Sequence, residues 1–212
     1  GGPGVPRRVA VLRSVPETEP HPSVVDGVDR AAAAMAAAGW DVVEAKPPEI
    51  GYCTEVWAYL LAADIAVLMD TARLVLSEEL TAALDETANR YSPSVMAPTA
   101  VHSELARLAR EWALFFIDHP VLVMPTWTIP QPEHGFDQGV GSTDAITSTL
   151  GCITPPNLLN LPSVAVPVGV SDGLPQGVQC VADRWRDDLA LTAAADIEAS
   201  LGTLTPIDPV LG

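Results

Sequence analysis

The segment Thr154–Leu191 limits the possible folds of this chain more than any other part of its sequence. Within it, the β-branched run Ser163–Val168 has the composition of a buried strand. The turn sequence Ser171–Gly173 follows, and Gln176–Val181 predicts a second strand. Two adjacent aspartates then suit the start of a helix, which we expect over about Asp187–Leu201. The segment therefore predicts two strands joined by a turn and followed by a helix.

The N-terminal part of the chain predicts a strand, a helix and a second strand in that order. The apolar run Arg8–Arg13 and the stretch Asp41–Ala45 each have the composition of a strand. Between them, apolar residues recur with helical spacing from Ser23, a residue type that caps helices, to Gly39, a residue type that ends them. Two parallel strands joined by a helix normally make a right-handed crossover. We therefore assign the chain to the α/β class.

The middle of the chain predicts three helices, one strand, a long loop and a short helix. These helices and the strand are expected, in chain order, over Tyr52–Leu68, Ser77–Asn89, Thr99–Asp118, Val121–Met124 and Ser142–Leu150. The stretch Pro125–Gly141 is rich in proline and glycine, and loops of this length in compact domains are usually functional or disordered. Because no internal repeat or linker is visible, we treat residues 1–212 as one unit.

The charge and cysteine content of the chain exclude several classes of partner. The net charge is −16, so the surface repels nucleic acids and anionic membranes. We find no apolar run of transmembrane length, and we expect no membrane partner. Cys53, Cys152 and Cys180 are too widely spaced for a disulfide framework, which favours a reducing, cytoplasmic setting.

The sequence offers no pattern for a metal ion or a cofactor. The histidines are scattered, and no two of them stand three or four residues apart on a predicted helix. The segment Gly173–Gly177 lies at the turn that leads into the second predicted strand, whereas a phosphate-binding loop joins a strand to a helix. We therefore expect neither a metal nor a cofactor.

The sequence PPNLLNLPSVAVPVGVSDGLPQGVQ, residues 155–179, resembles the C-terminal signature of the amidase signature family. The matching positions are Asn157, Pro162, Val166, Pro167, Gly173, Leu174, Pro175, Gly177 and Gln179. Enzymes of this family hydrolyse amides with a serine nucleophile. The resemblance implies their fold, a mixed β-sheet covered by helices, and a small-molecule amide as substrate.

The catalytic groups of that family lie in its N-terminal half, in a Gly/Ser-rich segment and an upstream lysine. Neither is recognisable in this sequence. The only lysine, Lys46, lies between a predicted strand end and Pro47, where the family keeps no catalytic group. We therefore interpret residues 1–212 as the C-terminal portion of an amidase-type domain, incomplete as a fold and without catalytic residues of its own.

Two other interpretations of the chain stay open at this point. In the first, it is a non-catalytic binding or scaffold protein that retains the amidase half-fold. A Gly/Ser-rich segment and a lysine encoded upstream of Gly1 would favour the amidase over this scaffold. In the second, the chain is an independent hydrolase with Cys152 as its nucleophile and His134 nearby in sequence. If the chain is such a hydrolase, thiol reagents should abolish its activity.

The resemblance also implies a wall of the substrate pocket. The sequence Met124–Thr126 matches the start of the loop that lines this pocket in the family, and Trp127 follows it. We expect Thr126, Trp127 and Asn157 to bind substrate, and we expect the Trp127 indole to stack on a planar group. In the competing interpretation, Trp127 fills a gap in the core.

The run Val164–Val168 predicts that the chain has a protein partner. Its side chains are apolar on both faces, which is typical of a strand in the interior of a sheet. Few further strands are predicted to surround it, so an apolar patch should be exposed. We expect a complementary N-terminal amidase segment, or self-association, to cover that patch.

Overall fold

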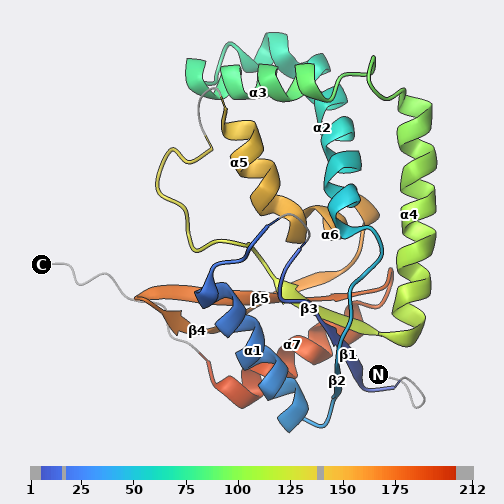
Figure 1. Ribbon diagram of the computed structural model, residues 1–212, viewed down its shortest axis with the longest axis vertical. Coiled ribbons are helices and arrows are strands. Elements are labelled where there is room, and N and C mark those ends of the chain that lie inside the picture. The colour runs from blue at the N-terminus through green and yellow to red at the C-terminus, as the bar shows by residue number, and fades with distance from the viewer. Residues whose placement is uncertain (1–5, 16–17, 138–140, 204–212) are drawn as a thin grey trace, which may run out of the picture.

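A computed structural model describes residues 6–15, 18–137 and 141–203, which form a five-stranded sheet with helices on both sides (Figure 1). The strands are β1 Arg8–Val11, β2 Asp41–Glu44, β3 Val121–Pro125, β4 Ser163–Ser171 and β5 Leu174–Ala182. Their order across the sheet is β2-β1-β3-β5-β4. The first three are parallel, and β5 is antiparallel to both β3 and β4. The predicted α/β class and mixed sheet are confirmed.

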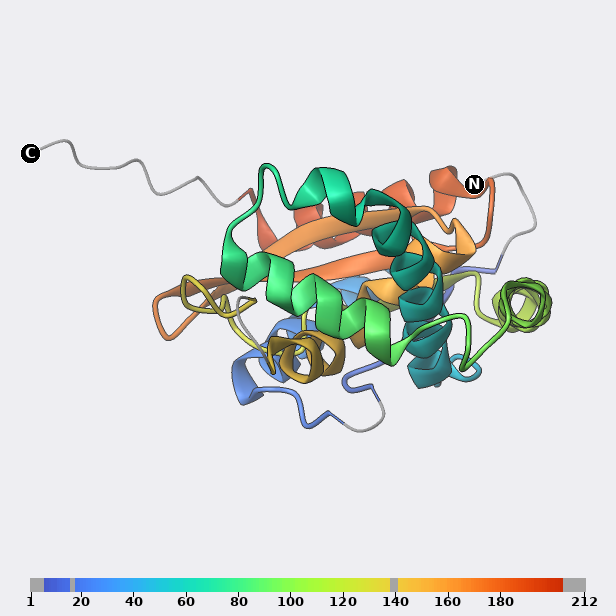
Figure 2. The ribbon, with the colours of Figure 1, turned by 90° about the horizontal axis from the view of Figure 1, so that it is seen from above.

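The helices cover the two faces of the sheet unequally (Figure 1). One face is covered by α1 Pro22–Ala37 and α7 Asp187–Leu201. On the other side lie α2 Ile50–Ala72, α3 Glu78–Arg90, α4 Pro98–Asp118, α5 Ser142–Thr149, the 3-10 helix Leu150–Cys152 and α6 Thr154–Leu159. Seen from above, α4 lies to one side of the other helices of this group (Figure 2).

The alternation of side chains along the strands divides the core into two layers. On β1, Val9 and Val11 pack with residues of α1 and α7, while Ala10 packs with residues of α2, α4 and α6. All five residues of β3 are buried. The carboxyl end of this central strand is therefore held firmly, and Thr126 and Trp127 follow it directly.

Helices α1, α2 and α4 begin earlier than the sequence predicts, and proline is the reason for α1 and α4. Helix α1 begins at Pro22, and the side chain of His21, rather than that of Ser23, accepts the capping hydrogen bond. Helix α4 begins at Pro98, with Ala97 at its N-cap position, one residue before the expected start at Thr99. Proline suits the first turn of a helix because its missing N–H would have no helical partner there.

The segment before β4 contains a helix, α6, that the sequence pattern does not predict. Pro155 and Pro156 lie in its first turn, where proline is tolerated. Asn160 ends the helix with a left-handed φ of 52°. Asparagine adopts this conformation more readily than most residues. The helix is six residues long, which is too short for a hydrophobic period to show in the sequence.

Strand β4 lies at an edge of the sheet, which agrees with the expectation that this chain alone lacks some of the strand's neighbours. That the strand is interior in a longer protein stays a prediction. Within residues 6–15, 18–137 and 141–203 it pairs only with β5. Val166 and Val168 are buried in the same layer as α1 and α7, whereas Ala165 and Pro167 are exposed on the opposite face. The apolar run that suggested an interior strand is therefore covered on one face and open on the other.

The expectation that no apolar run reaches transmembrane length is wrong for helix α2. Its 23 residues are long and apolar enough to cross a membrane by length and composition alone, with a mean hydropathy of 1.4 in the relevant window. Glu55, Asp64 and Asp70 interrupt the run and conceal its length in the sequence. That window is 44% buried in the structure, and a core helix of a soluble protein passes the same test. A single helix of this kind is weak evidence for a membrane span.

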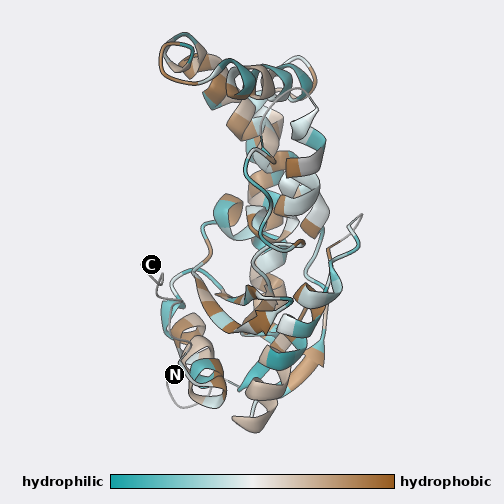
Figure 3. Ribbon diagram, turned by 90° about the vertical axis from the view of Figure 1, so that its left-hand side faces the viewer, coloured by the Kyte–Doolittle hydropathy of each residue, from teal (hydrophilic) through white to brown (hydrophobic). Residues whose placement is uncertain are grey.

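Hydrophobic residues are present at the end of the molecule farthest from the sheet, around the junction of α2 and α3 (Figure 3). Val67, Leu68, Leu74 and Val75 are each at least 60% exposed. These four residues form the helix-tip patch. Together with the open face of β4, it gives the described part of the chain two apolar surfaces that are exposed to solvent.

Candidate functional site

The carboxyl ends of β1, β2 and β3 lie at one edge of the sheet because these strands are parallel. Ligands of open α/β sheets usually bind beyond this edge. Of the cavities that lie there in the described structure, two also reach α5. One is lined by Val15 and Lys46, which follow β1 and β2, and the other by Trp127, which follows β3. Thr147 of α5 lines both.

The cavity next to β3, named here the aromatic cavity, has a volume of about 250 Å³. Its aromatic walls come from three segments that are distant in sequence: Trp57 of α2, Trp127, and Phe136 of the long loop. Aliphatic residues of α2, α3 and α5 complete the lining, among them Leu61, Ile65, Leu84 and Ile146. The cavity is thus mainly apolar, as binding sites for small organic molecules usually are.

Trp127 is half-buried, and its indole Nε1 has no hydrogen-bond partner although that atom is shielded from solvent. Buried polar atoms are normally paired, so an unpaired one needs an explanation. A residue that fills a gap in the core would be fully enclosed, as Trp112 is. Trp127 instead lines the aromatic cavity. Trp127 is therefore placed where it could contact a ligand in this cavity, and its contact with substrate stays a prediction.

Asn157 does not line the aromatic cavity itself, but it forms a hydrogen bond with Trp57, which does. The side chain is exposed on α6, and its Oδ1 accepts a 2.9 Å hydrogen bond from Nε1 of Trp57. A second link between the same helices joins the hydroxyls of Thr54 and Thr154 at 2.6 Å. These contacts fix α2 against α6 and orient the Trp57 ring. A direct contact between Asn157 and substrate stays untested.

Thr126 also lies outside the lining of the aromatic cavity. It is half-buried, and its hydroxyl donates a long hydrogen bond of 3.4 Å to the carbonyl oxygen of Gly177 on β5. Gly177 in turn pairs with Pro167 on β4. Thr126 therefore lies close to the open face of the β4–β5 hairpin, and its predicted contact with substrate stays a prediction.

Gln179 on β5 is the buried polar residue that joins the parts of this region. Its Nε2 donates to the carbonyl oxygens of Pro125, at 2.9 Å, and of Cys152, at 2.8 Å. Its Oε1 accepts a 2.7 Å hydrogen bond from the hydroxyl of Ser163. One side chain thus holds the end of β3, the 3-10 helix and the start of β4 in place. The position belongs to the signature, but the sequence does not reveal this role.

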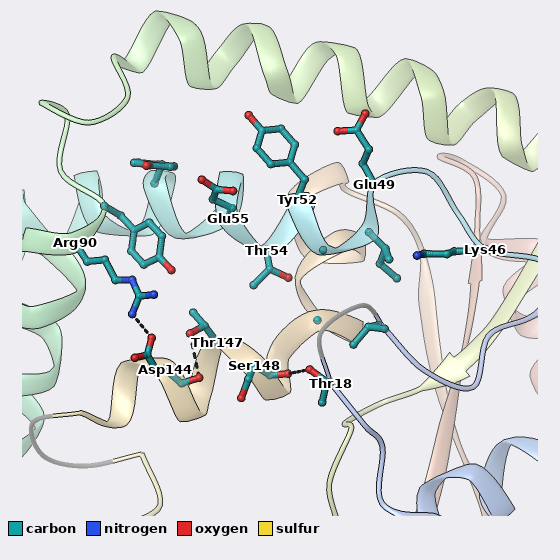
Figure 4. A pocket seen from close by; sticks show the side chains of 16 residues that line it. Thr18, Lys46, Glu49, Tyr52, Thr54, Glu55, Arg90, Asp144, Thr147 and Ser148 are labelled. Atoms are coloured by element: carbon teal, nitrogen blue, oxygen red, sulfur yellow. Dashed lines mark hydrogen bonds and ion pairs between the residues drawn. The ribbon is translucent and has the colours of Figure 1, made fainter.

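The second cavity, the polar cavity, has a volume of about 930 Å³ and lies between α2 and α5 (Figure 4). Arg90, at the end of α3, forms an ion pair with Asp144 of α5. The hydroxyl of Thr18 donates a 2.7 Å hydrogen bond to the carbonyl oxygen of Ser148. Figure 4 shows Arg90 and Lys46 at opposite ends of this cavity. Its walls combine charged and polar side chains with apolar ones, whereas those of the aromatic cavity are mainly apolar.

The structure does not support Cys152 as a nucleophile. Its side chain is fully buried, and burial raises the pKa of the thiol to about 12. A reactive cysteine needs the opposite change, a lowered pKa. His134 is exposed, and no hydrogen bond between the two is found in the described residues. Cys53 and Cys180 are also buried with pKa values of about 12, so all three cysteines lack the lowered pKa of a reactive thiol.

Lys46 is exposed and follows the end of β2 by two residues, as expected for a lysine at a strand end. A lysine that acts as a base is usually buried. In the part of the chain that the structure describes, no three His, Cys, Asp or Glu side chains gather as a metal site requires.

Comparison with known proteins identifies the family. The family model described as Amidase matches residues 4–191, and the chain therefore belongs to the amidase family. An indoleacetamide hydrolase of Bradyrhizobium japonicum is 33% identical over 211 residues, which are 95% of this chain and 44% of that protein. A 6-aminohexanoate-cyclic-dimer hydrolase of Pseudomonas sp. is 29% identical over 81% of this chain and 39% of that protein.

Solved structures agree with this assignment. A 6-aminohexanoate cyclic dimer hydrolase complexed with substrate superposes with a TM-score of 0.75 at 26% identity, over 96% of this chain and 46% of that one. A bacterial aryl acylamidase of the amidase signature family, with a TM-score of 0.66 at 17% identity over 92% of this chain and 44% of that one, shares the fold. The resemblance to the amidase signature family is confirmed. The chain spans less than half the length of the relatives named here.

The sequence pattern does not identify Trp57 and Phe136 as site residues. Trp57 lies in an apolar helix, where an aromatic residue normally belongs to the core, and only the packing of α2 beside the end of β3 brings it to the cavity. Phe136 lies in the long loop, which is a weak signal of function. No local pattern links either residue to Trp127.

Proposed function

We propose that this chain is the C-terminal portion of an enzyme that hydrolyses the C–N bond of a carboxylic amide. A Gly/Ser-rich segment and a lysine, both N-terminal to the residues given, would supply the serine nucleophile and its base. The observation that carries the proposal is that an amidase family match over residues 4–191 covers less than half of the relatives' length. The part present would contribute half of the sheet and a wall of the substrate pocket.

The open side of the β4–β5 hairpin supports this division of roles. The outer edge of β4 is unpaired in the described structure, and Ala165 and Pro167 are exposed on the face next to Gly177. Unpaired strand edges are templates for further pairing. In the proposed enzyme, the N-terminal segment adds strands along this edge and carries the nucleophile towards Thr126 and the aromatic cavity.

The substrate in this proposal is a small amide, with Thr126 and Trp127 on the wall of its pocket. Asn157 contributes through its hydrogen bond to Trp57. The names of two relatives, an indoleacetamide hydrolase and a 6-aminohexanoate-cyclic-dimer hydrolase, both denote enzymes that act on amides. The three buried, free cysteines support a reducing, cytoplasmic location.

The experiment is reconstitution of the complete enzyme. The segment encoded upstream of Gly1 is co-expressed with residues 1–212, and ammonia release from indole-3-acetamide is measured. We expect no hydrolysis by either part alone and hydrolysis by the complex. Serine-to-alanine substitution in the Gly/Ser-rich segment provides the control, and it should abolish the activity.

Two outcomes of the reconstitution would overturn the proposal. Hydrolysis by residues 1–212 alone would show that the chain has a catalytic apparatus of its own. A stable complex that hydrolyses neither aromatic nor aliphatic amides would favour the scaffold interpretation.

A further inference from the structure

The size of the aromatic cavity limits the ligand that it can hold. A cavity of roughly 150 Å³ in a protein interior accepts benzene. The aromatic cavity, at about 250 Å³, has room for a larger group. A bicyclic aromatic ring fits this larger volume, whereas a single water molecule or a methyl group would leave most of it empty.

The walls of the cavity favour a flat, aromatic ligand over a flexible aliphatic one. Trp57, Trp127 and Phe136 present three ring systems to one space. Aromatic rings attract other rings through offset-stacked and edge-to-face contacts, beyond the effect of burial. The Trp57 ring is held by its hydrogen bond to Asn157, so this wall is oriented before a ligand arrives.

Nε1 of Trp127 is unpaired and shielded from solvent in the present orientation of the ring, so the ring must turn to present this polar group to a ligand. An indole N–H can only donate a hydrogen bond. A ligand that enters the cavity with a hydrogen-bond acceptor, such as an amide oxygen, would therefore satisfy this atom. Apolar walls with a few well-placed polar groups are typical of sites for small organic molecules.

The charges around the cavity distinguish an amide from the acid that its hydrolysis produces. Asp137 lines the cavity and is exposed to solvent, and the whole chain carries a net charge of −16. A carboxylate ligand meets repulsion in this field, and a neutral amide does not. The cavity should therefore bind a neutral amide more tightly than the acid product.

We propose that the aromatic cavity is the specificity subsite of this enzyme and that it holds a planar, bicyclic aromatic group of a neutral amide substrate. Trp57 and Phe136 contact the ring, and Nε1 of Trp127 donates a hydrogen bond to an acceptor on the ligand. The assignment to substrate rests on the proposed function. The binding itself does not, because every wall of the cavity belongs to residues of this chain.

The binding test is an NMR titration of residues 1–212 that follows the five indole N–H signals of the chain. Trp127→Phe removes one signal and thereby assigns it. The ligands are indole-3-acetamide, indole-3-acetate and hexanamide. We expect indole-3-acetamide to move the Trp127 signal most, and the other two ligands to bind more weakly. Trp185, which is 90% exposed, provides the internal control and should not move.

Two variants separate the ring from the hydrogen bond. Trp127→Phe keeps an aromatic wall and loses the donor, so affinity for indole-3-acetamide should fall about two- to tenfold, the usual worth of one hydrogen bond. Trp127→Ala loses both and should bind still more weakly. The remaining indole signals report whether each variant is folded. Unchanged affinity in a folded Trp127→Ala variant, or equal binding of hexanamide, would overturn the proposal.

The result is independent of the reconstitution experiment. A reconstituted enzyme that hydrolyses amides but shows no binding of indole-3-acetamide at Trp127 would refute this subsite and leave the amidase proposal standing. Binding at Trp127 without hydrolysis by the complex would refute the amidase proposal and leave the ligand-binding cavity standing.

Discussion

Nε1 of Trp57 on α2 donates a 2.9 Å hydrogen bond to Oδ1 of Asn157 on α6, across a separation of 100 residues in sequence. Asn157 is one of the positions that match the amidase signature, and Trp57 is a wall of the aromatic cavity. The hydrogen bond thus connects a signature residue to the candidate substrate pocket through a neighbouring side chain. It also gives the asparagine a structural role in this chain, whether or not it contacts substrate.

Replacing Asn157 with alanine should release the Trp57 ring. Since the bond lies at the surface, we expect a loss of about 0.5–1.5 kcal/mol in the free energy of unfolding, measured by urea denaturation. Affinity for indole-3-acetamide should fall as well, because one wall of the cavity is no longer fixed. Asn89→Ala, at an exposed position of α3, is the control and should change neither quantity. A wild-type affinity in Asn157→Ala would show that the ring is held by packing alone.

Replacing Gln179 with leucine should cost more stability than any surface change. The substitution leaves the carbonyl oxygens of Pro125 and Cys152 without their donor, and an unsatisfied buried polar group costs roughly 1–3 kcal/mol. Gln131→Leu removes an exposed hydrogen bond to the carbonyl oxygen of Pro175 and serves as control. Equal denaturation midpoints for the two variants would contradict a central role for Gln179.

Replacing Trp127 with alanine should change ligand binding more than stability. Removing a fully buried aromatic side chain typically costs about 3–5 kcal/mol. We expect that loss for the control Trp112→Ala, because Trp112 is fully buried and donates to the carbonyl oxygen of Pro48. Trp127 is half-buried and faces a cavity, so its loss should be clearly smaller. A cost as large as that of Trp112→Ala would identify Trp127 as a residue that fills the core.

Purified residues 1–212 should self-associate, because the open face of β4 and the helix-tip patch are both exposed. Light scattering as a function of concentration measures this. Ala165→Lys places a charge on the open face of β4, which opposes edge pairing and should raise the monomer fraction. Ala36→Lys, on the exposed side of α1, makes the same change elsewhere and should have no effect. A monomer at high concentration would mean that these surfaces need no partner.

Most of the fold follows from local patterns in the sequence. The five strands and the long helices were predictable because strands such as β3, in which every residue is buried, form short apolar runs, whereas the helices show a clear apolar period. The order of the strands around β4 was not predictable, because an apolar run shows that a strand can be covered on both faces but not which strands are its neighbours. Helix α6 is too short to show a period.

The candidate site was predictable only in part. Trp127 could be selected because it follows a strand and begins a long loop. The partnership of Trp57 with Asn157, and the role of Gln179 beneath the end of β3, depend on contacts between segments distant in sequence. Such contacts leave no periodic signal in a single chain.

Covalent labelling shows whether the catalytic serine lies outside residues 1–212, as we propose. A fluorophosphonate probe is applied to residues 1–212 alone and to the complex with the upstream segment, and the labelled peptides are identified by mass spectrometry. We expect stoichiometric labelling of a serine in the upstream segment and none in residues 1–212. Stoichiometric labelling of any serine between Gly1 and Gly212, in either sample, would contradict the proposal.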